Sequence, residues 1–265
     1  MEGPHWQGQS AIVTGASSGI GSAIAAELAD AGARLVLTGR RLEALEEVAG
    51  RCRELGAAVH TLACDLTAPT AREELALLAR REYGALDLLV NNAGVTMNAR
   101  FSELAPEVLR TIFEINFFAA VELTRLVLPD LEARRGRILV ISSVTGLVGT
   151  PTRTAYAASK HALHGLFDAL RVEMRDHGIG VTIACPGYVA TPMRMHALLA
   201  DGSPQGHDQA AGRRMLTPEE VSRRVLRAAW HRKRLVKMGT ETYLARALSL
   251  VAPGLLERIL ARATR

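Results

Sequence analysis

The sequence has few aromatic residues, few cysteines and no long uninterrupted apolar run. Phe, Trp and Tyr make up only 4% of its 265 residues, and the three cysteines, Cys52, Cys64 and Cys185, are odd in number and widely separated. This pattern argues against a disulfide framework and against a metal site. No stretch approaches the roughly 18 apolar residues that a membrane-spanning helix needs, and the first residues do not resemble a signal peptide. We therefore expect a soluble, cytoplasmic protein without a metal.

Basic residues are concentrated near the end of the chain, although the net charge is only +5. Residues 213–265 hold thirteen Lys or Arg against four Glu. Nucleic-acid sites usually interleave aromatic residues with the basic ones, and such aromatics are almost absent here. We interpret the excess as solvated helix faces and expect no nucleic acid as a partner; a membrane-facing patch is the alternative.

Apolar runs alternate with longer helical patterns along the whole chain. The runs lie at residues 11–13, 34–37, 59–62, 86–90, 138–141 and 181–184. Their continuous apolar character predicts strands covered on both faces, and the alternation predicts parallel pairing. Residues 234–238 are expected to add a seventh, edge strand, followed by an apolar helix at about 240–260 that Pro253-Gly254 breaks. Without repeats or linkers, the sequence predicts one Rossmann-type, doubly wound α/β domain over residues 1–265.

A glycine-rich loop separates the first predicted strand from a helical run at residues 23–31. It reads Thr14-Gly15-Ala16-Ser17-Ser18-Gly19-Ile20-Gly21. Glycines let the backbone approach a pyrophosphate, and the free N–H groups at the start of a helix bind its charge. The spacing resembles the TGxxxGxG motif of the classical short-chain dehydrogenase/reductase family. The resemblance implies cofactor contacts from Gly15, Ser17, Ser18, Gly19, Ile20 and Gly21.

The end of the second predicted strand indicates which dinucleotide to expect. NAD-specific folds carry an acidic residue there for the ribose 2′-hydroxyl, whereas this chain has Arg40 and Arg41. The positive end of the following helix disfavours cations by about 0.3–1 kcal/mol, so the two side chains need a compensating anion. A 2′-phosphate fits, because guanidinium binds phosphate bidentately. We predict NADP(H), with Arg40 as the main selector and Arg41 as a helper; solvated arginines are the alternative.

Two further segments resemble the adenosine-binding motifs of this family. Asp65 and Leu66 follow the third strand, where an aspartate of the family holds the adenine amino group, although Asp65 could instead cap a helix near Pro69. Asn91-Asn92-Ala93-Gly94 matches the NNAG motif, whose small residues lie against the adenosine side of the cofactor. The second motif implies contacts from Asn92, Ala93 and Gly94.

The segment after the sixth strand, Cys185 to Pro192, resembles the family's PG motif. The resemblance implies that the backbone at Val189 and the Thr191 hydroxyl hold the nicotinamide carboxamide, with Pro186 and Gly187 shaping the turn. The likeness to the family extends almost without a gap over residues 10–192. Beyond it the resemblance weakens, as expected for substrate-specific sequence.

Tyr156 and Lys160 lie four residues apart in a helix-compatible run, which places the phenol and the ammonium on one face. Lowering a phenol pKa from about 10 to neutrality needs about 4 kcal/mol. A cation about 4 Å away supplies that only at an effective dielectric constant of about 20, so we expect the pair to be partly buried. In the family that this YxxxK pattern resembles, the tyrosine donates a proton to a carbonyl while the nicotinamide delivers hydride, and the lysine also binds the nicotinamide ribose.

Two more residues complete the resemblance. Ser143 precedes Tyr156 by the family spacing of 13 residues and is expected to polarise the carbonyl; neighbouring Ser142 should point to the opposite side. Asn116 stands among apolar residues, where the family has an asparagine whose backbone carbonyl holds a water linked to the lysine. A buried structural asparagine is the alternative. The predicted catalytic residues are Asn116, Ser143, Tyr156 and Lys160.

Substrate contacts are expected at the carboxyl ends of the strands. The segments at residues 95–101, 147–151 and 193–199 are mainly apolar and predict a pocket for a hydrophobic ketone, aldehyde or secondary alcohol, although the same side chains are equally suited to a core. The candidates are Met97, Phe101, Leu147, Val148, Met193, Met195, Leu198 and Leu199. Glycines and a proline among residues 193–213 predict a substrate lid.

Apolar stretches at residues 113–128 and 167–172 resemble helices that members of this family often use for two-fold contacts, which predicts a homodimer or homotetramer. The predicted C-terminal helix leaves three interpretations open, namely covering the sheet, joining subunits or resting on a membrane, and we favour the first two. Its apolar residues are Leu244, Leu248, Val251, Leu255, Leu256 and Ile259.

Together the motifs predict an NADP(H)-dependent oxidoreductase that acts on CH–OH donors and interconverts a carbonyl and an alcohol, NAD being the less favoured cofactor. A nucleotide-sugar epimerase shares the fold and the YxxxK pair but is disfavoured by the TGxxxGxG spacing and the short C-terminal region. A non-catalytic NADP(H)-binding regulator is the remaining alternative. It would not need Ser143, Tyr156 and Lys160, which are all present.

Overall fold

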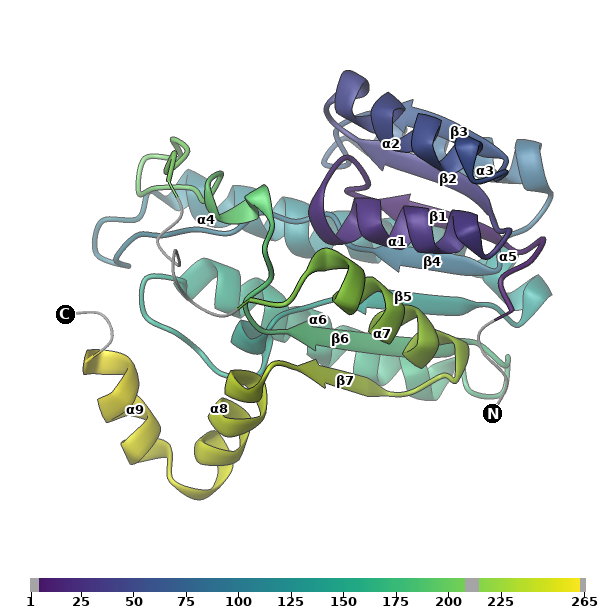
Figure 1. Cartoon of the computed structure of the whole chain (residues 1–265). Helices are drawn as coiled ribbons and strands as arrows, with labels where there is room; N and C mark the ends of the chain where they lie inside the picture. The colour runs from purple at the N-terminus through teal and green to yellow at the C-terminus, as the bar shows by residue number, and fades with distance from the viewer. Residues whose placement is uncertain (1–4, 208–214, 263–265) are drawn as a thin grey trace.

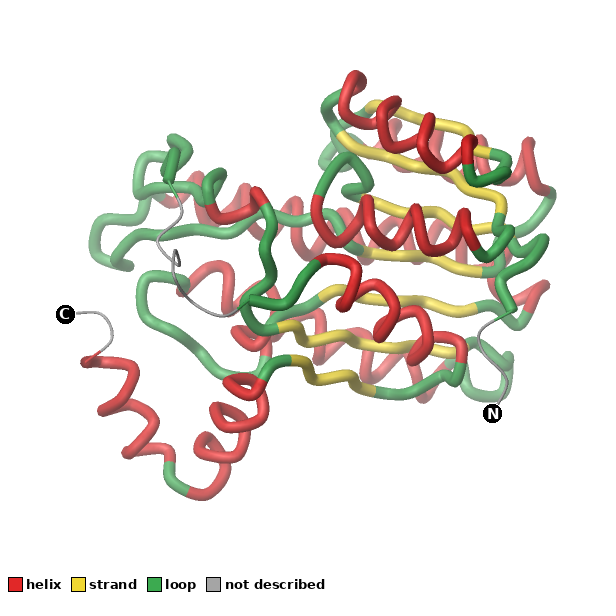
Figure 2. Tube along the Cα trace, viewed as in Figure 1, coloured by secondary structure: helices red, strands yellow, loops and turns green. Residues whose placement is uncertain are grey.

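Seven parallel strands form a single sheet in the computed structural model, which describes residues 5–207 and 215–262 (Figures 1 and 2). The strand order is β3-β2-β1-β4-β5-β6-β7, and every neighbouring pair is parallel. The strands are β1 (Ser10–Thr14), β2 (Arg34–Gly39), β3 (Val59–Ala63), β4 (Leu88–Asn91), β5 (Arg137–Ile141), β6 (Gly180–Pro186) and β7 (Leu235–Met238). The predicted Rossmann-type α/β fold is confirmed.

Helices cover both faces of the sheet, which explains the continuous apolar strands. One face carries α1 (Gly19–Asp30), α2 (Leu42–Glu54) and α7 (Pro218–Trp230), and the other carries α3 (Pro69–Tyr83), α5 (Ala119–Arg134) and α6 (Thr154–Glu173) (Figure 1). Neighbouring β1 residues serve the two layers, since Val13 packs in one core cluster and Ile12 in the other, both fully buried. Side chains that alternate along a strand therefore pack into two apolar cores, one on each face of the sheet, rather than into one core and solvent.

The loops that follow the strands gather at one edge of the sheet, on the left in Figure 1. There α4 (Pro106–Phe113) continues through a π-helical segment, η1 (Glu114–Phe118), into α5. Short 3₁₀ segments follow β5, at η2 (Val144–Gly146), and β6, at η3 (Pro192–Arg194). The edge formed by the carboxyl ends of the strands is where parallel sheets of this kind bind ligands.

The C-terminal region forms two helices, α8 (Thr240–Val251) and α9 (Pro253–Arg262), which project beyond β7 as a hairpin (Figure 1). The helix α8 ends at Val251, and the predicted break at Pro253-Gly254 coincides with the first two residues of α9. Leu256 is buried in the core between the sheet and the helices of the α6 face, whereas Val251 is 80% exposed. Only part of the apolar surface of the hairpin therefore covers the core, and another part is exposed.

Candidate active site

The backbone of the glycine loop can be approached by a ligand on one side and is closely packed against the protein on the other. Gly15 and Gly19 have positive φ angles of 63° and 58°, which favour glycine. A Cβ on Gly21 would lie 2.2 Å from the Gly15 carbonyl oxygen, so the third glycine lets α1 pack against the loop. Ser18 is the N-cap of α1, and neither a side-chain cap nor an acidic residue occupies the first turn. The helix start is therefore suited to an anionic pyrophosphate.

The glycine loop is joined to the segment after β4 by one threonine. The Thr14 hydroxyl donates to the Val90 carbonyl (3.0 Å) and accepts from the backbone N–H groups of Asn92 (2.9 Å) and Ala93 (3.0 Å). The Asn92 amide donates to the carbonyl oxygens of Thr14 (2.9 Å) and Gly15 (3.2 Å). Thus Asn92 and Ala93 are held beside the glycine loop, and Thr14 is a structural residue that our list of site residues lacked.

Arg40 and Arg41 extend from the end of β2 into solvent. Both are exposed, and neither guanidinium has a hydrogen bond or ion pair within residues 5–207 and 215–262. Ser17 of the glycine loop lies against the end of β2, because a Cβ on Gly39 would be 3.2 Å from its hydroxyl oxygen. Two exposed arginine side chains, without a partner among the described residues, and a serine hydroxyl therefore lie at the end of β2, where folds of this kind hold the adenosine ribose.

Asp65 is exposed, and its carboxylate accepts from the Thr67 backbone N–H and hydroxyl, both at 2.9 Å. The alternative that Asp65 caps α3 is wrong, because the N-cap of that helix is Ala68 and has no side-chain cap. Leu66 is buried, and its carbonyl accepts from Arg72, a buried residue paired with Glu122. These contacts fix the turn after β3 that would face the adenine.

Tyr156 and Lys160 share one face of α6, and both are buried, with 9% and 4% of their surfaces exposed. The Lys160 ammonium donates to the Ile141 carbonyl (2.9 Å) and lies 5.8 Å from the centre of the phenol ring. Burial lowers the pKa of Lys160 to about 8. The predicted partial burial of the pair is exceeded, since both side chains are almost fully enclosed by protein.

The electrostatics of the phenol differ from our expectation. Burial raises the pKa of Tyr156, and the largest opposing effects come from the hydrogen bond with Ser143 and the charge of Arg153 rather than from Lys160. Desolvation of the phenolate outweighs these stabilising contacts, and the Lys160 ammonium is hydrogen-bonded to a backbone carbonyl instead. The fold itself thus keeps Tyr156 protonated, which is the state that a proton donor needs.

Ser142 and Ser143 contact different residues of α6, His164 and Tyr156 respectively. Ser143 is near enough to the Tyr156 phenol to lower its pKa, and the Ser143 oxygen accepts from the Thr145 hydroxyl (2.8 Å). Ser142 is buried, and its hydroxyl lies 3.1 Å from His164 Nε2. Thr145 was missed by our sequence reasoning, although its position two residues after Ser143 could have indicated it.

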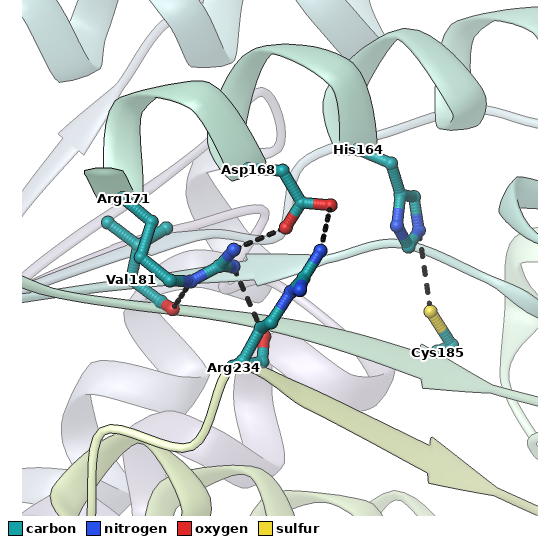
Figure 3. Close-up of polar contacts among 6 residues, drawn as sticks. All are labelled: His164, Asp168, Arg171, Val181, Cys185 and Arg234. Carbon is teal, nitrogen blue, oxygen red and sulfur yellow. Dashed lines mark hydrogen bonds and ion pairs between the residues drawn. The ribbon is translucent and has the colours of Figure 1, made fainter. Parts of the chain in front are cut away.

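His164 follows Lys160 by four residues on α6, and its contact with β6 is drawn in Figure 3. Its Nε2 also lies 3.5 Å from the Cys185 thiol, and burial lowers the pKa of His164 to about 4. One turn further, Asp168 pairs with Arg171 and with Arg234 (3.1 Å). These contacts fasten α6 to β6 and β7 and thereby fix the helix that carries Tyr156.

Asn116 lies in the π-helical segment η1 and is buried. Its side chain accepts from the Val95 N–H (2.8 Å) and donates to the Val95 carbonyl (2.9 Å) and to Ser159 (3.1 Å). A Cβ on Gly94 would lie 3.0 Å from Asn116 Oδ1 and 3.6 Å from Lys160 Nζ. The side chain is therefore structural, which fits the stated alternative, while its location beside Lys160 also fits the role that the family implies for its backbone.

The PG motif lies against the glycine loop. Pro186 ends β6, and a Cβ on Gly19 would lie 3.0 Å from the Thr191 methyl. Val189 is buried; its carbonyl accepts from Arg194 (2.9 Å), and it pairs with Leu216. The loop expected at the pyrophosphate and the loop expected at the nicotinamide are thus adjacent in space.

The apolar segments expected around the substrate are only partly exposed. Met97 is fully buried and packs with Ile112 and Tyr156, so it belongs to the core. Phe101 and Met195, by contrast, are 69% and 45% exposed. The segment proposed as a lid pairs with the loop after β4, since Leu198 bridges Met97 and the Asn98 N–H donates to the Leu198 carbonyl (2.8 Å). The lid prediction also covered residues 208–213, which lie outside the described residues.

Comparison with known proteins agrees with this geometry. Residues 9–201 match the model of the short chain dehydrogenase family. The chain is 38% identical over 262 residues to dehydrogenase/reductase SDR family member 7B of Bos taurus, an alignment covering 96% of this chain and 81% of the relative. It is 35% identical to the member 7B of Danio rerio, over 99% of this chain and 87% of the relative. It is 36% identical to member 7 of Homo sapiens, over 75% of this chain and 61% of the relative. The chain therefore belongs to the short-chain dehydrogenase/reductase family of oxidoreductases, which use NAD(P)(H).

Proposed function

We propose that this protein reduces a hydrophobic ketone or aldehyde to its alcohol with NADPH, and catalyses the reverse reaction with NADP⁺. The observation that carries the proposal is the buried phenol of Tyr156, which burial keeps protonated, with the Ser143 hydroxyl close enough to lower its pKa and Lys160 one helical turn away. A phenol in this state is an acid next to a hydroxyl that can hold a carbonyl oxygen.

The bound cofactor would supply a hydride to the carbonyl carbon. The chain's own residues handle the oxygen, whose developing negative charge is stabilised by the Ser143 hydroxyl and quenched by the proton of Tyr156. The Lys160 ammonium, with a pKa of about 8, is a stronger acid than the buried Tyr156 phenol and would be the group that resupplies the proton. In the alcohol-oxidising direction the same phenolate takes the hydroxyl proton.

The choice of NADP(H) is supported by Arg40. Its guanidinium is exposed, has no partner among the described residues, and lies at the end of β2 near Ser17. An anionic 2′-phosphate would satisfy it, whereas a 2′-hydroxyl would not. Arg41, the N-cap residue of α2, adds a second positive charge at the same turn.

A hydrophobic substrate is supported by the apolar side chains that remain accessible at the carboxyl edge. Phe101 and Met195 are exposed, while Met193, Leu198 and Leu199 are half-buried in the segment that pairs with the loop after β4. Apolar walls around a few converging polar groups are typical of small-molecule sites. Met97 no longer counts among the expected contacts, because it is enclosed in the core.

An NADPH-oxidation screen tests the proposal. The purified protein is mixed with aliphatic, aromatic and steroid-like carbonyls, and absorbance loss is compared with NADPH and with NADH. We expect turnover of at least one apolar carbonyl, a preference for NADPH, and loss of turnover in Tyr156→Phe. Stoichiometric NADPH binding without turnover, unchanged in Tyr156→Phe, would instead favour the non-catalytic regulator.

We also propose that the protein self-associates. Phe118 and Val172 lie in the two stretches expected at two-fold contacts and are 41% and 74% exposed. The tip of the α8–α9 hairpin offers a second apolar surface for contacts between subunits. A membrane contact at this surface is the less favoured alternative. Light scattering after gel filtration is expected to give twice or four times the mass of one chain, and a strictly monomeric species would refute the proposal.

A further inference from the structure

Glu241, in the first turn of α8, reaches from the C-terminal hairpin to the backbone of the PG motif. Its carboxylate Oε1 accepts a hydrogen bond from the Tyr188 N–H at 3.1 Å. Tyr188 directly precedes Val189, whose backbone the family resemblance places at the nicotinamide carboxamide. The side chain therefore contacts the cofactor-binding loop from behind.

Two glycines leave room for this carboxylate. A Cβ on Gly187 would lie 1.8 Å from Glu241 Oε1, and a Cβ on Gly239 would lie 2.4 Å from the same oxygen. At Gly187 the three nearest atoms all belong to Glu241, and φ of that residue lies outside the range that disfavours other amino acids. A side chain at position 187 would therefore collide with the Glu241 carboxylate, which explains the glycine at this position.

The PG loop is fastened on both sides. On one side, the Leu216 N–H donates to the Tyr188 carbonyl and the Ala190 N–H donates to the Leu216 carbonyl, both at 2.9 Å. On the other side, the Gly187 N–H donates to the Met238 carbonyl at the end of β7 (2.9 Å), and Glu241 holds the next N–H along. Removing Glu241 would therefore take away one of the two hydrogen bonds named on that side, the one nearer to Val189.

We infer that Glu241 is a positioning residue that holds the PG loop in place for the nicotinamide half of the cofactor. The inference rests on the proposed function, because it requires a nicotinamide dinucleotide beside Val189. Glu241 touches neither substrate nor cofactor in this account and acts through the backbone of Tyr188. Its loss should weaken the nicotinamide end of the site while the adenosine end, built from the glycine loop and Arg40, stays intact.

Binding measurements separate the two ends of the site. NADPH contains both halves, whereas 2′,5′-ADP contains only the adenosine half with its 2′-phosphate. For Glu241→Ala we expect about tenfold weaker NADPH binding in a fluorescence titration, with an unchanged affinity for 2′,5′-ADP measured by calorimetry. Glu241→Gln keeps an oxygen that can accept the Tyr188 N–H and should restore NADPH affinity to within about threefold of wild type. Glu257→Ala, at an exposed carboxylate on α9, is the matched control and should change neither affinity.

Gly187→Ala provides an independent test. The added methyl group should displace the flexible Glu241 side chain, so this variant should show the same selective loss of NADPH affinity as Glu241→Ala. The double variant should be no weaker than either single variant, because both changes remove the same contact. Additive losses in the double variant would overturn the proposal.

The remaining outcomes are distinguishable. Equal affinities for NADPH in wild type and Glu241→Ala would overturn the role of Glu241 and leave the proposed function standing. A parallel loss of NADPH and 2′,5′-ADP binding would have the same consequence, because it indicates general damage to the fold. Failure of the wild-type protein to bind either NADPH or NADH would overturn both proposals.

Discussion

Replacing Lys160 with methionine should stabilise the fold while abolishing turnover. Burial lowers the pKa of Lys160 from 10.5 to about 8, so keeping the ammonium charged inside the protein at pH 7 costs about 3 kcal/mol. Methionine removes that cost at similar length but leaves the Ile141 carbonyl without its donor, a loss of about 1 kcal/mol. We therefore expect a net gain of about 2 kcal/mol in the free energy of unfolding, or about 5 °C in the melting temperature.

The pH dependence checks the cause of this gain. The unfolded chain keeps the Lys160 proton up to about pH 10.5, whereas the folded protein releases it near pH 8. Raising the pH from 8 to 10 therefore stabilises the wild type relative to its unfolded state, and the advantage of Lys160→Met should shrink over that interval. Urea denaturation at pH 7, 8, 9 and 10 measures both quantities, with Lys233→Met, at an exposed lysine, as the control that should change little. A Lys160→Met variant that is less stable than wild type at pH 7 would refute the reasoning.

Three further predictions follow from the site. Arg40→Ser should weaken NADPH binding about tenfold or more and leave NADH binding nearly unchanged, because only NADPH carries the 2′-phosphate that the guanidinium would bind. Fluorescence titration with both cofactors measures this, and equal losses of affinity would show that Arg40 does not select NADPH over NADH. Ser143→Ala should lower kcat by about 100-fold while Ser142→Ala changes it only a few-fold, because only the first serine faces the phenol; steady-state kinetics that rank them the other way would reverse the assignment. Gly21→Ala should disrupt the loop, because its Cβ would lie 2.2 Å from the Gly15 carbonyl, and a variant with normal NADPH affinity would contradict that packing.

The fold was predictable because its signals are local and repeated. Each strand from β1 to β6 is a short apolar run followed by a helical pattern, and the edge strand β7 was predicted within one residue. The break between α8 and α9 follows from Pro253 alone, since proline cannot continue the helix hydrogen bonds of the preceding turn. The π-helical segment at Asn116 had no such local signal, because it depends on the contacts of that side chain with Val95 and Ser159.

The site was predictable as a set of motifs but not as an electrostatic environment. The positions of Ser143, Tyr156 and Lys160 followed from their spacing, yet the direction of the Tyr156 pKa shift depends on burial and on Arg153, which are properties of the folded chain. Met97 looked like a substrate contact because its chemistry suits a pocket as well as a core. Glu241 escaped notice because its partner Tyr188 lies 53 residues away and is contacted through the backbone.

Deuterium transfer tests the central claim most directly. The protein is incubated with NADPH carrying deuterium at the transferable position and with a carbonyl identified in the screen, and the alcohol is analysed by NMR. Our account predicts deuterium at the carbinol carbon with wild-type protein and none above background with Tyr156→Phe at matched cofactor occupancy. Equal incorporation in the two proteins, or none with wild type despite bound NADPH, would contradict it.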